Sequence, residues 1–425
     1  MQIRGVVAIQ VLDSRGNPTV RVRLTDDGGR EFVAGVPAGA STGSREAKEL
    51  RDGDPGRYGG RGVSRAVEHV NNEIAHLVTA QAWTSLAELD DALRSLDGTA
   101  DKSRLGANAI VGVSMAAARA FAQDRSEPLY RYLASSAGTG LRLPVPHFNV
   151  LNGGAHAANA LDFQEFMIAP IGAPSYAEAM RWGAEVYASL RSELRRVGLT
   201  SGLGDEGGFA PDIADPRRAC ELLVAAIGDT GLSADSEGVA LAIDPAANGF
   251  FDGSSYSLDG QEMSPSALVE FYRGLIDEFP VWSLEDGCAE GDDDGWQLLT
   301  RELGEVVQLV GDDIFVTDPA TIRAAADADL ANAALIKVNQ IGTVSETLDA
   351  LTVCRERGYA AMISHRSGET PDSFIADLAV GSGCGQIKSG APARGERVAK
   401  YNRLLEIASQ EDDVPYGLAE PRVDR

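Results

Sequence analysis

The chain has 425 residues, with 63 acidic and 38 basic side chains and a net charge of −25. This length allows two or three domains, and an α/β barrel can occupy most of it. The negative charge repels nucleic-acid phosphates and anionic lipid, and no apolar run reaches the roughly 18 residues that span a bilayer. We therefore expect a soluble globular protein that binds neither nucleic acid nor membrane.

The first 36 residues have the pattern of three short strands. VVAIQV, TVRVRL and EFVAGV alternate apolar and polar positions, and the turn-forming segments DSRGNP and DDGG separate them. This pattern predicts a three-stranded antiparallel sheet. The same stretch lacks the charged start, long apolar centre and cleavage site of a secretory signal, so we expect no export.

Helical spacing replaces the alternation between about residues 63 and 123. Apolar residues recur at three-and-four spacing in AVEHVNNEIAHLV, SLAELDDALRSL and ANAIVGVSMAAARAFA, which predicts helices over one face of the small sheet. The segment LRLPVPHFNVLNGG then brings two prolines and a change of pattern, as at a domain boundary. We predict a small α+β domain over residues 1–140 and a second domain over residues 141–425.

Short apolar runs in the second domain each end in a polar residue and precede a helical stretch. This strand-and-helix rhythm favours a closed parallel α/β barrel over an open sheet. Such a barrel places catalytic groups at the carboxyl ends of its strands. Six residues mark those ends, 23 to 41 positions apart: Asp244, Glu285, Asp312, Lys337, His365 and Lys388.

Three of these strand ends carry carboxylates: Asp244, Glu285 and Asp312. Brought together, they would repel one another, and a hard divalent cation such as Mg²⁺ would relieve the repulsion. Asp286 and Asp313 leave each ligand assignment uncertain by one position. The alternative is three solvated carboxylates at the rim of the barrel.

Two strand ends carry lysines. Lys337 lies in the apolar run ALIKV, and burial lowers the pKa of a lysine from about 10.4 unless a carboxylate pairs with it. A lysine with a lowered pKa can act as a base, and Lys388 in GQIKSG follows the same pattern. A structural ion pair is the alternative for each, but two lysines facing a carboxylate cluster favour catalysis.

The segment SHRSGET predicts an anion site. His365, Arg366 and Ser367 follow a strand, where a guanidinium fork and a hydroxyl can bind phosphate oxygens. The loop PAGASTGS, residues 37–44, has the glycines and hydroxyls of a lid that approaches a phosphate closely.

A glycine-rich segment, GLGDEGG at residues 202–208, has the spacing of a dinucleotide-binding loop. No apolar strand precedes it, Pro211 follows where a helix should begin, and its acidic residues would repel a pyrophosphate. We instead predict that Glu206 pairs with Glu165 of FQEF, because two nearby carboxylates can share a proton and stay acidic near neutral pH. DDDG at residues 292–295 does not fit a calcium loop and is expected to be a solvated turn.

The four cysteines indicate a reducing compartment. They have no CxxC spacing and are too sparse for a disulfide framework, so we expect a cytoplasmic protein. The cysteines are Cys220, Cys288, Cys354 and Cys384.

Several long motifs resemble those of the enolase family, and the resemblance runs from Asp13 to Ile407. The resemblance implies a small α+β domain followed by an eight-stranded barrel with an atypical second helix and strand order. The motifs are GASTGSRE, LGANAI, LNGGAHA, QEFMI, GDEGGFAP, LVGDDIFVT, IKVNQIGT, SHRSGET and IADLAVG.

The resemblance also implies an activity, the magnesium-dependent dehydration of 2-phospho-D-glycerate to phosphoenolpyruvate in glycolysis and gluconeogenesis. Lys337 would remove the proton from C2, and Glu206, supported by Glu165, would protonate the departing hydroxyl. His156 would close over the site on its own loop. The family further implies a homodimer or a higher assembly.

The ligands of the metal ions and the substrate are likewise implied by motif position. A first Mg²⁺ would bind Asp244, Glu285 and Asp312, and a second would arrive with the substrate at Ser41 of the lid. The residues implied to bind substrate are Ser41, His156, Gln164, Glu165, His365, Arg366, Ser367 and Lys388.

Some segments depart from the motifs usual in the family. They are DPAANGF with Asn248 and Gly249, PHFN with His147 and Phe148, and single alanines at Ala38 and Ala158. We expect them near the mouth of the site. They motivate an alternative, a paralogue of specialised metabolism that acts on a related phospho- or phosphono-carboxylate, like a carboxyphosphonoenolpyruvate synthase. A third hypothesis, a binding scaffold that has lost the chemistry, is disfavoured by the intact acid, base and metal ligands.

Overall fold

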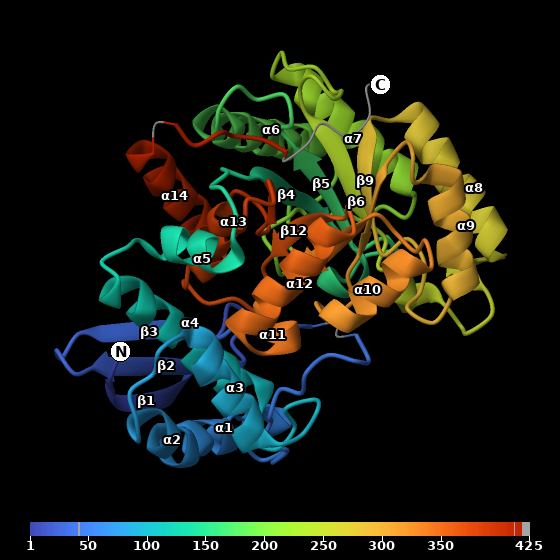
Figure 1. Cartoon of the computed structure of the whole chain (residues 1–425). Helices are drawn as coiled ribbons and strands as arrows, with labels where there is room; N and C mark the ends of the chain where they lie inside the picture. Colours follow the sequence, from blue (N-terminus) through green and yellow to red (C-terminus); the bar gives the residue numbers. More distant parts are fainter. Residues whose placement is uncertain (41–42, 412, 419–425) are drawn as a thin grey trace.

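A small antiparallel sheet opens the chain in the computed structural model, which describes residues 1–40, 43–411 and 413–418. Its strands are β1 (Ile3–Leu12), β2 (Pro18–Asp26) and β3 (Glu31–Gly35), in the order β1-β2-β3 (Figure 1). Val20, Val22 and Leu24 of β2 are fully buried, whereas the alternate residues Arg21 and Arg23 face outward. The predicted three-stranded sheet is therefore confirmed, and its pleat separates the apolar face from the polar face.

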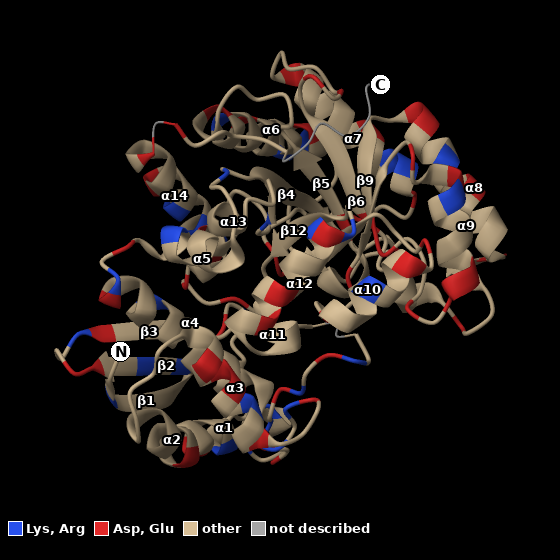
Figure 2. Cartoon of the chain, viewed as in Figure 1, with Lys and Arg blue, Asp and Glu red and all other residues tan. Residues whose placement is uncertain are grey.

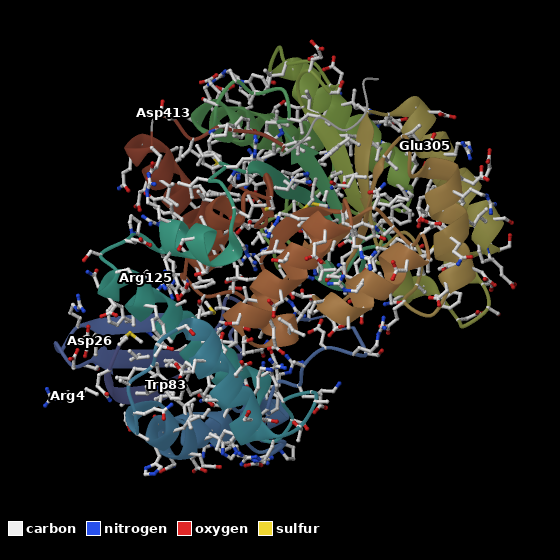
Figure 3. The ribbon with its side chains drawn as sticks, in the orientation of Figure 1. Arg4, Asp26, Trp83, Arg125, Glu305 and Asp413 are labelled. Atoms are coloured by element: carbon white, nitrogen blue, oxygen red, sulfur yellow. The ribbon has the colours of Figure 1, made fainter. Side chains whose placement is uncertain are left out.

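Helices cover the apolar face of this sheet, as predicted. The longest of these helices, α4 (Ala107–Asp124), lies against β2 and β3. It can approach β2 closely because Gly112 has no side chain; a Cβ at this position would lie only 2.7 Å from Val22 Cγ2. Trp83, labelled in Figure 3, is 2% exposed and donates its indole N–H to the Val78 carbonyl. The helices are α1 (Ser64–His69), the π-helical η2 (Val70–Ile74), α2 (Ala75–Thr79), α3 (Leu86–Asp97), α4 (Ala107–Asp124) and α5 (Leu129–Ala137), after the short 3-10 turn η1 (Tyr58–Gly60).

Eight further strands close into a barrel, with neighbours in chain order around it (Figure 1). The barrel fold is therefore confirmed. All six residues predicted to mark strand ends are the last residue of a strand or lie directly after one. The strands are β4 (Val145–Asn152), β5 (Glu165–Ala169), β6 (Ala240–Asp244), β9 (Val281–Glu285), β10 (Gln308–Gly311), β11 (Ala333–Ile336), β12 (Ala360–Ser364) and β13 (Gln386–Lys388).

One barrel strand runs against the others. β5 pairs antiparallel with both β4 and β6, so the expectation of an all-parallel barrel is wrong at this strand. Because β5 is reversed, its first residue, Glu165, lies opposite Asp244, the last residue of β6. The reversal brings Glu165 to the rim where the parallel strands end. β4, its partner, lies within the segment that the sequence pattern marked only as a boundary.

Helices surround the barrel, and Figure 2 shows Asp and Glu spread over their outer surfaces with Lys and Arg among them. The DDDG segment is not the expected turn, because Asp292 accepts the Gly295 N–H and caps the helix that begins at Asp293. A short hairpin follows β6. The remaining elements are η3 (Gly154–His156), α6 (Tyr176–Arg196), α7 (Pro216–Asp229), η4 (Ala247–Phe250), β7 (Tyr256–Leu258), β8 (Gln261–Met263), α8 (Pro265–Glu278), α9 (Asp293–Leu303), α10 (Pro319–Asp327), α11 (Val338–Ile341), α12 (Val344–Glu356), α13 (Phe374–Ser382) and α14 (Gly395–Gln410).

The small sheet and its helices pack against one side of the barrel rim. Arg119 of α4 forms an ion pair with Asp372 at 2.6 Å, and Ala38 forms a β-bridge with Gly368. These contacts place the loop after β3 beside the loop after β12. Among the described residues, no helix is both long and apolar enough to cross a membrane.

Candidate active site

The predicted site residues meet in one small cavity at the carboxyl end of the barrel. Ser41 lies outside the described residues, and each of the other predicted site residues lines this cavity. Ser364, which was not predicted, lines it too. The lining residues are His156, Gln164, Glu165, Glu206, Asp244, Glu285, Asp312, Lys337, Ser364, His365, Arg366, Ser367 and Lys388.

Three buried carboxylates form one part of the cavity. Asp244, Glu285 and Asp312 come from the neighbouring strands β6, β9 and β10. Burial raises the pKa of Asp244 to about 7 and that of Glu285 to about 8, and nearby carboxylates add to both shifts. The cluster thus favours an added positive charge, and its all-oxygen donor set fits a hard divalent cation. Lys388 Nζ lies 2.8 Å from Glu285 Oε1 and partly neutralises the cluster.

The neighbouring residues Asp286 and Asp313 are engaged elsewhere. Asp286 accepts the backbone N–H groups of Asp312 and Asp313, at 2.8 and 3.0 Å. Asp313 accepts the side-chain amide of Asn248 at 2.8 Å. Asp286, Asp312 and Asp313 are close enough to form a second acidic group. However, neither Asp286 nor Asp313 lines the cavity, so the geometry favours the first residue of each pair as the ligand.

Lys337 lies directly after β11, and its ammonium contacts Asp312. Burial lowers the pKa of Lys337, but the Asp312 carboxylate raises it and the net shift is upward. The lowered pKa expected for an unpaired lysine is therefore not found, because the lysine is paired. Burial by itself would raise the pKa of Asp312, but the positive charge of Lys337 lowers this pKa by more, so the net shift is downward.

A second pair of carboxylates lies beside His156. Oxygen atoms of Glu165 and Glu206 and a ring nitrogen of His156 all lie within 4.8 Å of one another. Burial, reinforced by Glu206, raises the pKa of Glu165 to about 8. Burial also raises the pKa of Glu206, but its polar surroundings, the His365 and His156 side chains together with Arg397, hold that pKa well below its ordinary value. The two carboxylates are coupled, so one proton can stay on the pair near neutral pH.

The predicted anion site contains a buried ion pair. Glu46, just after the 37–44 loop, lies 3.0 Å from Arg366 and accepts from both ends of its guanidinium fork. Gln340 donates to Glu46 and also to Asp312, at 3.2 and 2.8 Å. Ser367 accepts from Arg15 of the small domain at 3.4 Å. Residues of the small domain thus hold the phosphate-seeking side chains in place.

Comparison with known families agrees with this architecture. Residues 3–133 match the family model described as the enolase N-terminal domain, and residues 140–417 match the enolase C-terminal TIM barrel domain. The two matches cover nearly the whole chain. The chain belongs to the enolase family. Its two domains are those of an enolase-superfamily enzyme of the lyase type. Its clustered acidic side chains could bind a metal ion.

None of the departures from the enolase motifs lines the cavity itself, and their expected place near its mouth stays a prediction. His147 and Phe148 are fully buried in β4. His147 faces Trp282 with ring centroids 5.5 Å apart, and Phe148 packs on Tyr401 at 4.9 Å. Asn248 joins two rim loops by donating to Asp313 and accepting the Glu290 N–H.

Several residues that support the enolase site were not predicted. Asn149 donates to Glu206 Oε2 at 3.0 Å, but it lies in the segment taken as a boundary. A strand pattern through LRLPVPHFNVLNGG would have revealed it. Glu46, Gln340 and Arg397 act through contacts between distant parts of the chain, and no local pattern signals such contacts.

Proposed function

We propose that the chain catalyses the Mg²⁺-dependent loss of water from 2-phospho-D-glycerate, giving phosphoenolpyruvate. One observation carries this proposal: a lysine, a buried pair of carboxylates and a cluster of three further carboxylates line the same cavity. Removal of a proton from carbon and of hydroxide from its neighbour requires a base, an acid and concentrated positive charge. The cavity contains side chains for each task.

The side chains divide the proposed work as follows. Lys337, in its neutral form, would take the proton from C2, and Glu206, with Glu165 beside it, would deliver a proton to the departing hydroxyl. Asp244, Glu285 and Asp312 would hold Mg²⁺, which supplies positive charge next to the substrate carboxylate when bound. Ser41, outside the described residues, would contribute to a second Mg²⁺ site that forms with the substrate.

Cationic side chains bind and orient the anionic substrate in this scheme. Arg366 and Ser367 bind the phosphate, and Lys388 binds the carboxylate. His156, His365 and Gln164 complete the wall around it. These local cations matter because the chain as a whole carries a charge of −25 and repels anions at longer range.

The test is direct. Purified protein mixed with 2-phosphoglycerate and Mg²⁺ should generate the ultraviolet absorbance of phosphoenolpyruvate, and a chelator should abolish the signal until Mg²⁺ is restored. Lys337→Ala should be inactive under the same conditions. No signal from the wild type, or equal signals from the wild type and Lys337→Ala, would sink the proposal.

The alternative substrate, a related phospho- or phosphono-carboxylate, was motivated by the departing segments. Those segments lie outside the cavity lining, so the geometry favours 2-phosphoglycerate. Measurements of kcat/KM on 2-phosphoglycerate and on a phosphono-carboxylate analogue distinguish the two candidate substrates. A value on 2-phosphoglycerate in the ordinary enzyme range, about 10⁴ M⁻¹ s⁻¹ or more, excludes the paralogue.

We further propose that the protein is a homodimer and acts in the cytoplasm. Val7 and Ile9 on one face of β1, and Leu12 at its end, are 50 to 57% exposed, and an exposed apolar edge strand favours association. Ile9→Lys should shift the sedimentation coefficient of a dimer towards that of the monomer. An unchanged dimer would place the interface elsewhere.

A further inference from the structure

Arg397 of α14 is a fully buried cation directly behind the active site. Its guanidinium donates to the backbone carbonyls of Arg366 and Ser367, both at 2.6 Å, and contacts His365 Nδ1. Gly390 makes room for it, because a Cβ there would meet Arg397 Cδ at 2.9 Å. The surrounding chain therefore holds the guanidinium in one place.

The chemistry of arginine decides which nitrogen of His365 carries the proton. A guanidinium has only donors and stays protonated in proteins, so the atom it contacts must accept. His365 Nδ1 faces Arg397 and must therefore be the unprotonated nitrogen. Burial, with Arg397 and Lys388 nearby, also lowers the pKa of His365 to about 3 despite Glu206, so the ring is neutral near pH 7. The single ring proton is left on Nε2.

That proton faces Glu206. His365 Nε2 lies 3.1 Å from Glu206 Oε2, and the Asn149 amide donates to the same oxygen at 3.0 Å. The other oxygen, Oε1, lies 3.7 Å from His156 Nε2. Asn149 already donates to Oε2 and the His365 Nε2 proton lies beside that oxygen, so an acidic proton fits better on Oε1, which faces His156 in the cavity.

We propose that Arg397 is a positioning residue: it holds His365 in the Nε2–H tautomer and so confines the transferable proton of Glu206 to Oε1. This inference rests on the proposed function for the role of Glu206 as the acid. The tautomer itself depends only on Arg397 and His365, so it can be tested without any turnover.

The first experiment reads the tautomer by long-range ¹H–¹⁵N NMR of protein labelled in histidine. The chain has only five histidines, and the His365→Leu variant assigns the His365 signals by their loss. We expect a neutral ring with Nε2 protonated, unchanged between pH 5.5 and 7.5. A proton on Nδ1, or a charged ring at pH 7, overturns the proposal even if the protein is an active enolase.

The second experiment asks whether Arg397 acts through His365. Arg397→Met should lower kcat by on the order of 10-fold or more with little change in KM, and Arg397→Lys should restore part of the loss. In the His365→Leu background, Arg397→Met should add almost no further loss, because there is no ring proton to place. Equal losses in both backgrounds would show a purely structural role and overturn the proposal.

Arg403→Lys is the matched control. Arg403 lies on the same helix but pairs with Asp377, away from the cavity. Circular dichroism checks that each variant is folded before kinetics are compared. If no variant or wild type acts on 2-phosphoglycerate, the proposed function fails, and the NMR result still decides the tautomer.

Discussion

The carboxylates of the site differ because of their neighbours. Glu165 and Glu206 are both buried, yet the pKa of Glu165 is raised and that of Glu206 is lowered. Burial and the charge of Glu206 raise the pKa of Glu165 even though Lys388 lies 3.2 Å away, whereas two histidine rings flank Glu206. A buried pair that shares one proton can supply an acid near neutral pH while the other members of the cluster stay charged.

The separate roles of base and acid lead to a prediction about partial reactions. Glu206→Gln should lower the rate of water loss by about 10²- to 10⁴-fold, because it removes the proton donor. Exchange of the C2 proton with solvent should persist, since Lys337 performs it. Deuterium incorporation into 2-phosphoglycerate, followed by NMR, measures this exchange.

Two variants complete that comparison. Lys337→Ala should lose both exchange and water loss, whereas Glu221→Gln on the exposed face of α7 should lose neither. If Glu206→Gln abolishes exchange together with water loss, the assignment of acid and base to different residues is wrong.

At the scale of elements, the barrel places each side chain through the direction of its strand. Seven strands deliver their carboxyl ends to the rim, and the reversed β5 delivers its first residue. Helix α6 packs against β4 through Gly183, where a Cβ would lie 2.2 Å from Phe148 Cε2. Close packing of this helix thus supports the wall that carries Asn149 and Asn152.

Gly183→Ala should therefore destabilise the protein despite the better helix propensity of alanine. We expect a loss of about 1–3 kcal/mol from overpacking against Phe148. Gly228→Ala in α7 is the matched control, because no other atom lies within 4 Å of the Cβ position. This variant should be more stable than the wild type by up to about 1 kcal/mol, since alanine has the higher helix propensity. Urea unfolding measures both. Equal effects of the two variants would contradict the packing argument.

At the scale of the whole molecule, the small domain and the barrel meet through buried polar contacts. Asp90 of α3 accepts from the backbone N–H and the hydroxyl of Ser345 on α12, at 3.0 and 2.6 Å. Its other oxygen, Oδ1, has no partner among the described residues. Burial raises the pKa of Asp90 to about 6, although its bonds with Ser345 lower it. We therefore predict that the stability of this contact depends on pH.

The sign of this dependence follows from proton binding. An unfolded aspartate titrates near pH 3.9, so between about pH 4 and 6 the folded state binds more protons than the unfolded state. Stability from this group is therefore full below pH 4 and falls as the pH rises through 6. Asp90→Asn should remove that fall, which amounts to on the order of 3 kcal/mol for a shift of about two pKa units.

Unfolding free energies of the wild type, Asp90→Asn and the exposed control Asp91→Asn at pH 4.5 and 7.0 test this prediction. Only Asp90→Asn should become more stable relative to the wild type as the pH rises from about 4.5 to 7.0. If all three proteins change in parallel, Asp90 does not titrate in this range.

Local patterns in the sequence were sufficient for the small sheet, the barrel rhythm and the residues at the strand ends. Alternation and helical spacing show which side of a single strand or helix is buried. The polar residues that follow each apolar run mark the strand ends without any knowledge of tertiary contacts. The proposed base and metal ligands lie at such positions, which is why they could be predicted, whereas the proposed acid Glu206 lies in the glycine-rich loop at residues 202–208. The domain boundary at residues 140 and 141 stays a prediction; α5 ends at Ala137 and β4 begins at Val145.

Only the tertiary structure shows the direction of β5, which of the neighbouring acidic residues line the cavity, and which charges surround each titratable group. Strand direction depends on which edges pair, and pKa depends on burial and on charges from other elements, so neither is encoded within one segment. Arg397 shows the same limit. It lies 32 residues from His365 in the chain, and only the fold places its guanidinium against the ring.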